Sequence, residues 1–167
     1  NDKRVTIYAC GPTVYGPGHI GNGRSAIVFD TLTRLLRYKY EKVIYARNIT
    51  DVDDKIITAS KDEGISVSEI TDKYTKQYHK DFERLNVLPP DIEPFATDHI
   101  NEMISFINEL ISNENAYISD SNVLFDVSTF SEYGSLSGRK IEDMIPGSRI
   151  KLESYKKGTS DFILWKP

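Results

Sequence analysis

Cysteine is almost absent from this sequence, since Cys10 is the only one among 167 residues. A single thiol cannot form an internal disulfide, which excludes the small disulfide-stapled domains of the cell exterior and is typical of a reducing compartment. The chain also lacks a run of about 18 to 20 apolar residues, and its first residues are too polar for a signal peptide. We therefore expect a cytoplasmic protein with no membrane partner, whose thiol is free for packing, metal binding or chemistry.

An excess of positive charge is also lacking, because the net charge is -4 at pH 7. Proteins that bind nucleic acid mainly through the charge of the phosphate backbone usually have a strongly basic surface, so any contact with RNA must involve a local part of this chain. Hydrophobic residues make up 39% of the chain and charged residues 28%, which is typical of a folded globular domain. The sequence opens on a strand-like run and stops within an apolar one, so we expect a fragment of a longer protein.

The first half of the chain alternates between strand and helix patterns. Val5 to Cys10 is β-branched and aromatic, runs into a loop rich in glycine and proline, and is followed by an apolar stripe of helical spacing from about Ser25 to Tyr38. A second strand is predicted over 43–49, followed by a helix that is capped within 50–54 and ends at Gly64. Two more helices are predicted, one that begins with a capping box at 66–69 and one that is capped by Thr97. The β-α-β order predicts an α/β fold of Rossmann-like type with a parallel sheet.

After Asn115 the sequence pattern changes from helical spacing to short segments typical of β-strands. Residues 116–119 and 123–127 are predicted to form two strands around a polar turn, with another short strand near 149–153. We interpret residues 1–115 as the first half of a catalytic domain and 116–160 as a small β-rich insertion. The strand-like segment 161–167 is interpreted as the return of the chain to the main domain.

The loop over residues 10–24 carries the strongest functional signal. It lies between a strand and a helix N-terminus, where backbone N–H groups and the helix dipole favour an anion such as a phosphate. Within it stand Cys10-Gly11-Pro12-Thr13-Val14-Tyr15 and His19-Ile20-Gly21-Asn22, and Arg47-Asn48-Ile49-Thr50-Asp51-Val52-Asp53-Asp54-Lys55 follows the second strand. The tetrad resembles the His-Ile-Gly-His signature of class I aminoacyl-tRNA synthetases, and the flanking segments narrow the resemblance to the cysteinyl-tRNA synthetase family.

This resemblance implies an enzyme that activates L-cysteine with ATP and transfers it to tRNA(Cys). It implies that His19 and Asn22 are catalytic donors and that Thr13, His19, Gly21 and Asn22 bind ATP, which is accompanied by Mg²⁺. Gly11 and Thr50 match residues that contact the amino acid. Asn22 replaces the second histidine of the signature, and an amide can donate a hydrogen bond but cannot act as a general acid. A monomer is expected.

For Cys10 the residue type alone favours a small buried apolar side chain. The resemblance implies instead that its thiolate is one ligand of a Zn²⁺ that takes the substrate thiolate in an open position, which would discriminate against serine. The other ligands of the family pattern lie outside this sequence. We therefore expect the chain alone to be inactive and to bind zinc weakly or not at all.

Other polar residues are given structural interpretations. Asp51, Asp53 and Asp54 are read as cap and helix-dipole partners rather than metal ligands, and His79 and His99 as surface or packing residues of amphipathic helices. Two alternatives to the tRNA ligase stay open at this point. One is the cysteine-activating ligase of mycothiol biosynthesis, and the other is a noncatalytic paralogue of the synthetase.

Overall fold

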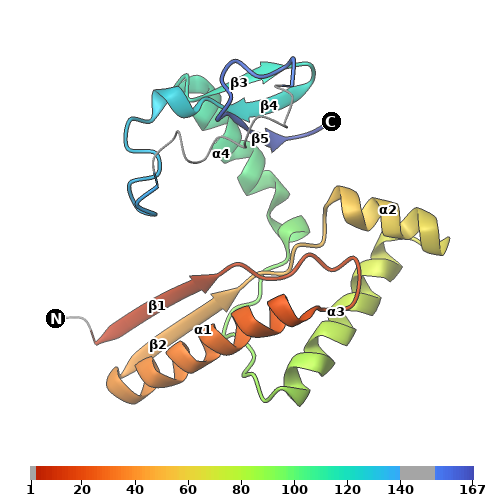
Figure 1. Cartoon of the computed structure of the whole chain (residues 1–167), viewed down its shortest axis with the longest axis vertical. Coiled ribbons are helices and arrows are strands. Elements are labelled where there is room, and N and C mark those ends of the chain that lie inside the picture. Colours follow the sequence, from red (N-terminus) through yellow and green to blue (C-terminus); the bar gives the residue numbers. More distant parts are fainter. Residues whose placement is uncertain (1–2, 140–152) are drawn as a thin grey trace. The chain divides into compact units, whose positions relative to one another are not determined.

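The computed structural model describes residues 3–139 and 153–167. The chain divides into two compact units, residues 1–100 and 101–167, which are described separately (Figure 1). The predicted strand near 149–153 lies almost entirely outside the described residues. Among the residues described, no helix has the length and apolar character needed to cross a bilayer.

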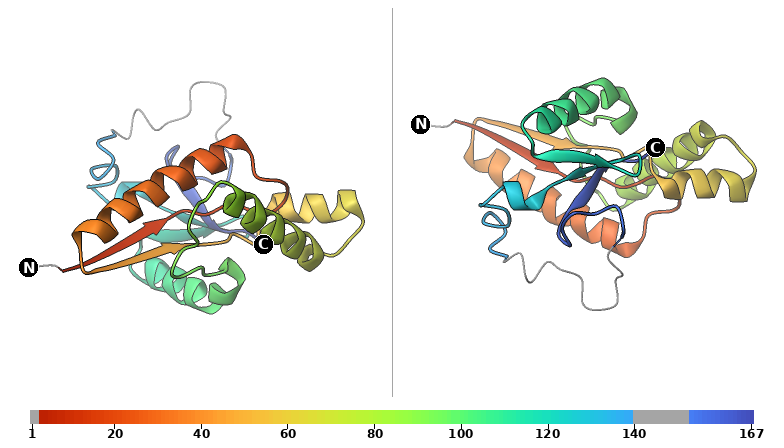
Figure 2. Two further views of the ribbon diagram at one scale, coloured as in Figure 1. Left: turned by 90° about the horizontal axis from the view of Figure 1, so that it is seen from below. Right: turned by 90° about the horizontal axis from the view of Figure 1, so that it is seen from above.

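The first unit is built on a parallel β-α-β arrangement, which confirms the predicted fold. Strand β1 (Arg4–Ala9) leads through the glycine-rich loop into helix α1 (Ile20–Lys39), and strand β2 (Lys42–Arg47) follows. The two strands pair in parallel, from Arg4 opposite Lys42 to Ala9 opposite Arg47. Helix α1 runs alongside both strands (Figures 1 and 2), which brings the loop after β1 and the end of β2 to the same end of the sheet.

Two helices follow with the predicted caps. Helix α2 (Asp54–Glu63) begins after Asp53, whose carboxylate accepts a hydrogen bond from Lys55 N at 2.8 Å, and ends at Gly64 with a φ of 67°. Helix α3 (Val67–Arg84) begins with the expected capping box, in which Ser66 Oγ and the Glu69 carboxylate exchange hydrogen bonds with backbone N–H groups. These ends are set by local side-chain chemistry, so the sequence pattern located them correctly.

The prediction that Thr97 caps a helix is wrong. The short 3₁₀ helix η1 (Ala96–His99) follows Phe95, which makes no side-chain cap. Thr97 instead donates its N–H, at 3.0 Å, and its hydroxyl to the buried carboxylate of Asp51. A charged acceptor 46 residues away thus holds Thr97, because hydrogen bonds to a buried carboxylate are stronger than a neutral helix cap.

The core of the first unit lies where the loop, α1 and α3 meet. Its buried side chains and their partly buried neighbours are Val14, Tyr74, Ala26, Ile49, Tyr78, Phe82, Val87 and Phe95. Beyond β2 the backbone continues the pairing through isolated bridges, of Ile49 with Phe95 and of Thr50 with Thr13. The strand ends that carry the candidate site are therefore held on both sides by backbone hydrogen bonds.

The second unit contains helix α4 (Ile100–Ser112), strands β3 (Ala116–Ser119) and β4 (Asn122–Phe125), the 3₁₀ helix η2 (Val127–Thr129) and strand β5 (Phe162–Trp165). The strands form an antiparallel sheet in the order β3-β4-β5. The second unit includes α4 and begins at residue 101. It therefore begins one helix earlier than the change in sequence pattern after Asn115. The strand-like segment after residue 160 takes β4 as its backbone partner.

A buried carboxylate ties the second unit together. Asp161 is 3% exposed and accepts hydrogen bonds from the Tyr117 hydroxyl at 2.7 Å, Val127 N at 3.1 Å and Gly158 N at 2.8 Å. Three donors compensate the desolvation of this charge. Asp161 therefore fixes the loop before β5 against the sheet.

Candidate functional site

The site is organised by the first turn of helix α1. The helix begins at Ile20, five residues before the start that its apolar stripe predicted, because His19 and Asn22 form a reciprocal cap. His19 Nδ1 accepts a hydrogen bond from Gly21 N at 3.1 Å, and Asn22 Oδ1 accepts one from His19 N at 3.0 Å. The cap extends the helix through a Gly-Asn-Gly segment of poor helix propensity.

This cap also fixes the chemistry of the His19 ring. Since Nδ1 acts as an acceptor, the neutral imidazole carries its proton on Nε2. Asn22 directs its oxygen to the backbone, so its NH₂ group is the donor that stays available. The first turn thus presents two N–H donors, from Nε2 of His19 and Nδ2 of Asn22.

Gly21 leaves the space that this arrangement requires. A Cβ atom at this position would lie 2.8 Å from His19 Cε1 and 2.9 Å from Nδ1. Any side chain there would displace the ring from the cap. The Gly21 amide itself is engaged by His19, which limits its availability to a ligand.

A hydrogen-bond chain locks Gly11 to the end of β2. Gly11 N donates to Asn48 Oδ1 at 2.9 Å, Asn48 Nδ2 donates to Thr50 Oγ1 at 3.0 Å, and Thr50 N donates to Pro12 O at 2.9 Å. A Cβ atom at Gly11 would fall 1.5 Å from the Asn48 carbonyl oxygen, so only glycine allows this approach of the two backbones. Gly11 and Thr50, predicted to contact the amino acid, are thereby brought together through Asn48.

One cavity, of about 270 Å³, gathers several of the predicted site residues, and we call it the thiol cavity. Its lining includes Cys10, Gly11, His19, Gly21 and Asn22. Cys10 is exposed, and its thiol donates a weak hydrogen bond to Gly11 O at 3.6 Å. Cys10 is therefore not the buried apolar residue that its type alone favoured.

A second cavity, of about 250 Å³, lies over the glycine-rich loop and is called the loop cavity. It shares Gly11, His19 and Asn22 with the thiol cavity and adds Thr13, among others. Lys55 also lines it, with its ammonium 5.2 Å from the centre of the Tyr15 ring. Lys55 was not identified as a site residue from the sequence. Its position in the first turn of α2, just after the end of β2, was the available signal for a cation near the glycine-rich loop.

Arg47 and Tyr78 were also missed as site residues. Both line the thiol cavity, and Arg47 Nη1 donates to the Tyr78 hydroxyl at 3.1 Å. Burial raises the pKa of Tyr78, while the adjacent guanidinium acts in the opposite direction. The signal in the sequence that could have identified Arg47 was an arginine within a strand predicted to be buried, since charged residues are seldom fully buried unless they are paired.

The described residues do not form a metal site by themselves. No group of three or more His, Cys, Asp or Glu side chains in this part of the chain is arranged to hold a metal ion. Of the three acids after β2, Asp53 caps α2, Asp54 stands in its first turn, and Asp51 holds Thr97. His79 pairs with Glu93 at 2.8 Å, and His99 is exposed in η1.

Comparison with known proteins places these features in a family. The model of the tRNA synthetases class I (C) catalytic domain matches residues 1–167. A cysteine–tRNA ligase of Parvibaculum lavamentivorans is 57% identical over 98% of this chain and 35% of its own length. That of Maricaulis maris is 54% identical over 98% of this chain and 36% of its own. The chain thus spans about a third of the length of these curated relatives.

Solved structures agree on the fold. A Mycobacterium tuberculosis methionyl-tRNA synthetase in complex with methionyl-adenylate has a TM-score of 0.60 at 19% identity, over 75% of this chain and 24% of that one. A second structure of the enzyme, bound by methionyl-adenylate, gives 0.58 at 18% identity, over 68% of this chain and 22% of that one. Because the family model matches over the whole length, this chain belongs to the family of class I (C) tRNA synthetase catalytic domains.

Proposed function

We propose that this chain is part of a cysteine–tRNA ligase and supplies the first portion of its adenylate-forming site. In that reaction a carboxylate oxygen of L-cysteine attacks the α-phosphorus of ATP, a new P–O bond forms, and pyrophosphate leaves. A hydroxyl of the terminal adenosine of tRNA(Cys) then attacks the cysteinyl carbonyl, and AMP leaves. The high identity to relatives that bear this name supports the proposal.

The observation that carries the proposal is that Cys10, His19 and Asn22 line one cavity. A thiol and two fixed N–H donors in one cavity of about 270 Å³ suit a substrate that joins a sulfur-bearing amino acid to a phosphate. The methionyl-tRNA synthetase of similar fold was solved in complex with methionyl-adenylate. This likeness supports a nucleotide in the same region of the fold.

His19 and Asn22 act in the proposed site as donors rather than acids or nucleophiles. Negative charge develops on the phosphoryl oxygens during adenylate formation, and donors held in place stabilise it without reorganisation. The first turn of α1 contains no acidic residue, so the positive end of the helix dipole adds to this effect. Thr13 completes the proposed ATP contacts, Gly21 serves the ATP site by leaving room for the His19 ring, and Mg²⁺ accompanies the nucleotide.

Gly11 and Thr50 are the proposed contacts to cysteine, since both stand at the strand ends beside Cys10. Cys10 is proposed as one zinc ligand, because a soft thiolate suits Zn²⁺ and sulfur coordination of the substrate would discriminate against serine. Residues outside this chain must supply the other ligands. We propose that residues 116–160 form the connective insertion within a catalytic domain that residues 1–115 begin.

The zinc proposal makes a direct prediction for the chain alone. With one ligand instead of three or four, the purified chain should retain well under one equivalent of zinc after dialysis. Metal analysis by mass spectrometry measures this, with Cys10→Ser as the control. One tightly held equivalent in the wild-type chain that persists in Cys10→Ser would contradict the assignment of Cys10.

The proposed function is tested by replacing the donors in a protein that contains this chain. His19→Ala should slow cysteine-dependent ATP–pyrophosphate exchange by about 10²- to 10³-fold, the typical effect of losing one fixed donor. Asn22→His should be mild, because a neutral imidazole also offers one acceptor and one donor. His99→Ala, at an exposed position, is the matched control and should change nothing.

Two results would refute the proposal. One is equal exchange rates for wild type and His19→Ala. The other is exchange without any charging of tRNA(Cys), which would indicate another acceptor for the activated cysteine, such as the amino sugar of the mycothiol pathway.

A further inference from the structure

Lys55 brings a positive charge to the loop cavity that no carboxylate there compensates. The lining of this cavity includes Lys55 but no Asp or Glu from the described part of the chain. None of the ion pairs found between described residues includes Lys55. The chain as a whole has a net charge of -4, so this cavity differs in sign from the rest of the protein. A concave surface of this kind attracts anions.

The position of Lys55 in helix α2 is unfavourable for a cation. Lys55 stands in the first turn, where the positive end of the helix dipole repels a positive charge. Lys61, in the last turn of the same helix, stands where the dipole favours a cation. The Lys55 ammonium lies instead over the Tyr15 ring, 5.2 Å from its centre. This contact holds the charge beside the glycine-rich loop, to which Tyr15 belongs.

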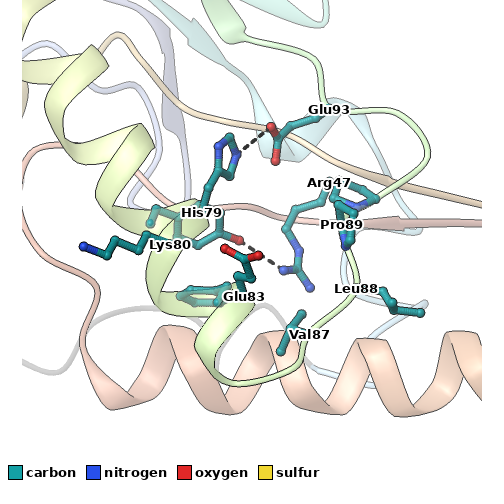
Figure 3. A pocket seen from close by; sticks show the side chains of 11 residues that line it. Arg47, His79, Lys80, Glu83, Val87, Leu88, Pro89 and Glu93 are labelled. Atoms are coloured by element: carbon teal, nitrogen blue, oxygen red, sulfur yellow. Dashed lines mark hydrogen bonds and ion pairs between the residues drawn. The ribbon is translucent and has the colours of Figure 1, made fainter.

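Another cavity of the first unit, of about 460 Å³, lacks this electrostatic character. Glu83 and Glu93 line it, and Figure 3 shows the Lys80 amine directed away from Arg47. The Arg47 guanidinium is buried and already donates to the Tyr78 hydroxyl. A phosphate of charge near -2 would be repelled by the two carboxylates, whereas in the loop cavity Lys55 faces no such opposition.

The residues shared by the loop cavity and the thiol cavity indicate which phosphates would reach Lys55. His19 and Asn22 line both cavities, so the α-phosphate of ATP would lie beside these donors. Cysteine would attack from the thiol cavity, where Cys10 lies. The attacking and leaving oxygens of a phosphoryl transfer are roughly in line, on opposite sides of the phosphorus. The departing pyrophosphate would therefore extend into the loop cavity, whose lining adds Lys55.

We propose that Lys55 binds the β- and γ-phosphates of ATP and the pyrophosphate that they become, and that Tyr15 positions its ammonium. A compact ammonium with three donors suits several phosphate oxygens at once. When the bond to the α-phosphorus breaks, the pyrophosphate keeps the electron pair, and the ammonium stabilises the added negative charge. The inference rests on the proposed function for the identity of the nucleotide, whereas binding of pyrophosphate can be measured without any reaction.

The first test is an NMR titration of the ¹⁵N-labelled chain with inorganic pyrophosphate. Saturable shifts should appear at the amides of Gly16, Gly18 and His19, which line the loop cavity. Lys55→Met should weaken binding by about fivefold to tenfold, because it removes one charged donor. Lys61→Met removes the same charge from an exposed position of the same helix, outside the cavity lining, and should change affinity by less than about twofold.

Conservative variants separate a contact through charge from an effect on packing. Lys55→Arg keeps the charge and should stay within about threefold of the wild type. Tyr15→Phe keeps the aromatic face and should bind pyrophosphate as the wild type does. Tyr15→Leu removes that face and should weaken binding by about twofold to fivefold, because the ammonium is no longer held beside the loop.

The second test is cysteine-dependent ATP–pyrophosphate exchange in a longer protein that contains this chain. Lys55→Met should raise the KM values for ATP and for pyrophosphate by about fivefold to tenfold, with the KM for cysteine unchanged. Competitive inhibition by AMP should not change, because AMP lacks the phosphates that Lys55 binds. A general defect in folding would alter all of these values together, and Lys61→Met should alter none.

Four outcomes decide the matter. Equal affinity of wild type and Lys55→Met for pyrophosphate would overturn the proposal, and so would equal losses in Lys55→Met and Lys61→Met. A raised KM for tRNA(Cys) with an unchanged KM for ATP would overturn it in favour of a contact with RNA. Lys55-dependent pyrophosphate binding without any exchange by the wild type would support the phosphate site and refute the proposed ligase function.

Discussion

Replacement of Gly21 by alanine tests how the first turn of α1 holds the His19 ring. The new Cβ would lie 2.8 Å from His19 Cε1, closer than van der Waals contact allows, and the ring is the group that can move. Its movement breaks the hydrogen bond from Gly21 N to Nδ1, a cap of about 1 kcal/mol. Alanine stabilises a helix by about 0.5 to 1 kcal/mol relative to glycine, which offsets the lost cap, so the net change in the free energy of unfolding should be close to zero.

Gly23→Ala is the matched control on the same helix. A Cβ atom there would meet Leu85 Cδ1 at 3.5 Å, an ordinary contact, so the helix propensity gain of about 0.5 to 1 kcal/mol should appear in full. Gly21→Ala should therefore be less stable than Gly23→Ala by about 1 kcal/mol. Urea unfolding measures the difference, and ¹⁵N shifts of the His19 ring report whether Nδ1 still accepts a hydrogen bond.

The refuting result is specific. If both variants gain the same stability and the His19 ring keeps the ¹⁵N shifts of the wild type, then Gly21 is not what makes room for the ring. If Gly21→Ala loses the ring position while cysteine-dependent exchange in the longer protein is unchanged, then the cap does not serve the proposed chemistry.

Two further pairs of variants probe the strand ends and the buried tyrosines. Gly11→Ala should destabilise the chain by about 2 kcal/mol or more, since its Cβ would overlap the Asn48 carbonyl oxygen, whereas Gly16→Ala meets no atom within 4 Å and should be near neutral in urea unfolding. Tyr45→Phe should be neutral or stabilising, because the buried Tyr45 hydroxyl has no partner in the described part of the chain, while Tyr78→Phe should cost about 1 kcal/mol. Burial raises the pKa of both phenols, so the folded chain holds their protons more tightly than the unfolded one. Stability should then be intact below pH 10 and fall as the pH rises through the raised values, with a shallower fall in Tyr45→Phe; an unchanged pH profile would contradict this.

Local patterns along the sequence determined the order of elements and most of their ends. The apolar stripe predicted α1, and Asp53, Gly64 and Ser66 marked helix ends, because caps depend on residues three or four positions away. The family signature also identified His19, Asn22 and Cys10 as candidate site residues from the sequence alone. Patterns of this kind act over short range, which is why one sequence sufficed.

Long-range contacts decided the rest. The early start of α1 was missed for a local reason, because histidine is not a residue that cap preferences favour. Thr97, by contrast, left its expected cap because Asp51, 46 residues away, accepts its hydrogen bonds. The placement of Arg47 against Tyr78 joins a strand to a helix 31 residues further along the chain. The sequence alone determined which residues have reactive or capping groups, whereas only the tertiary structure decided which of them share a cavity, because backbone pairing and packing between distant segments set those distances.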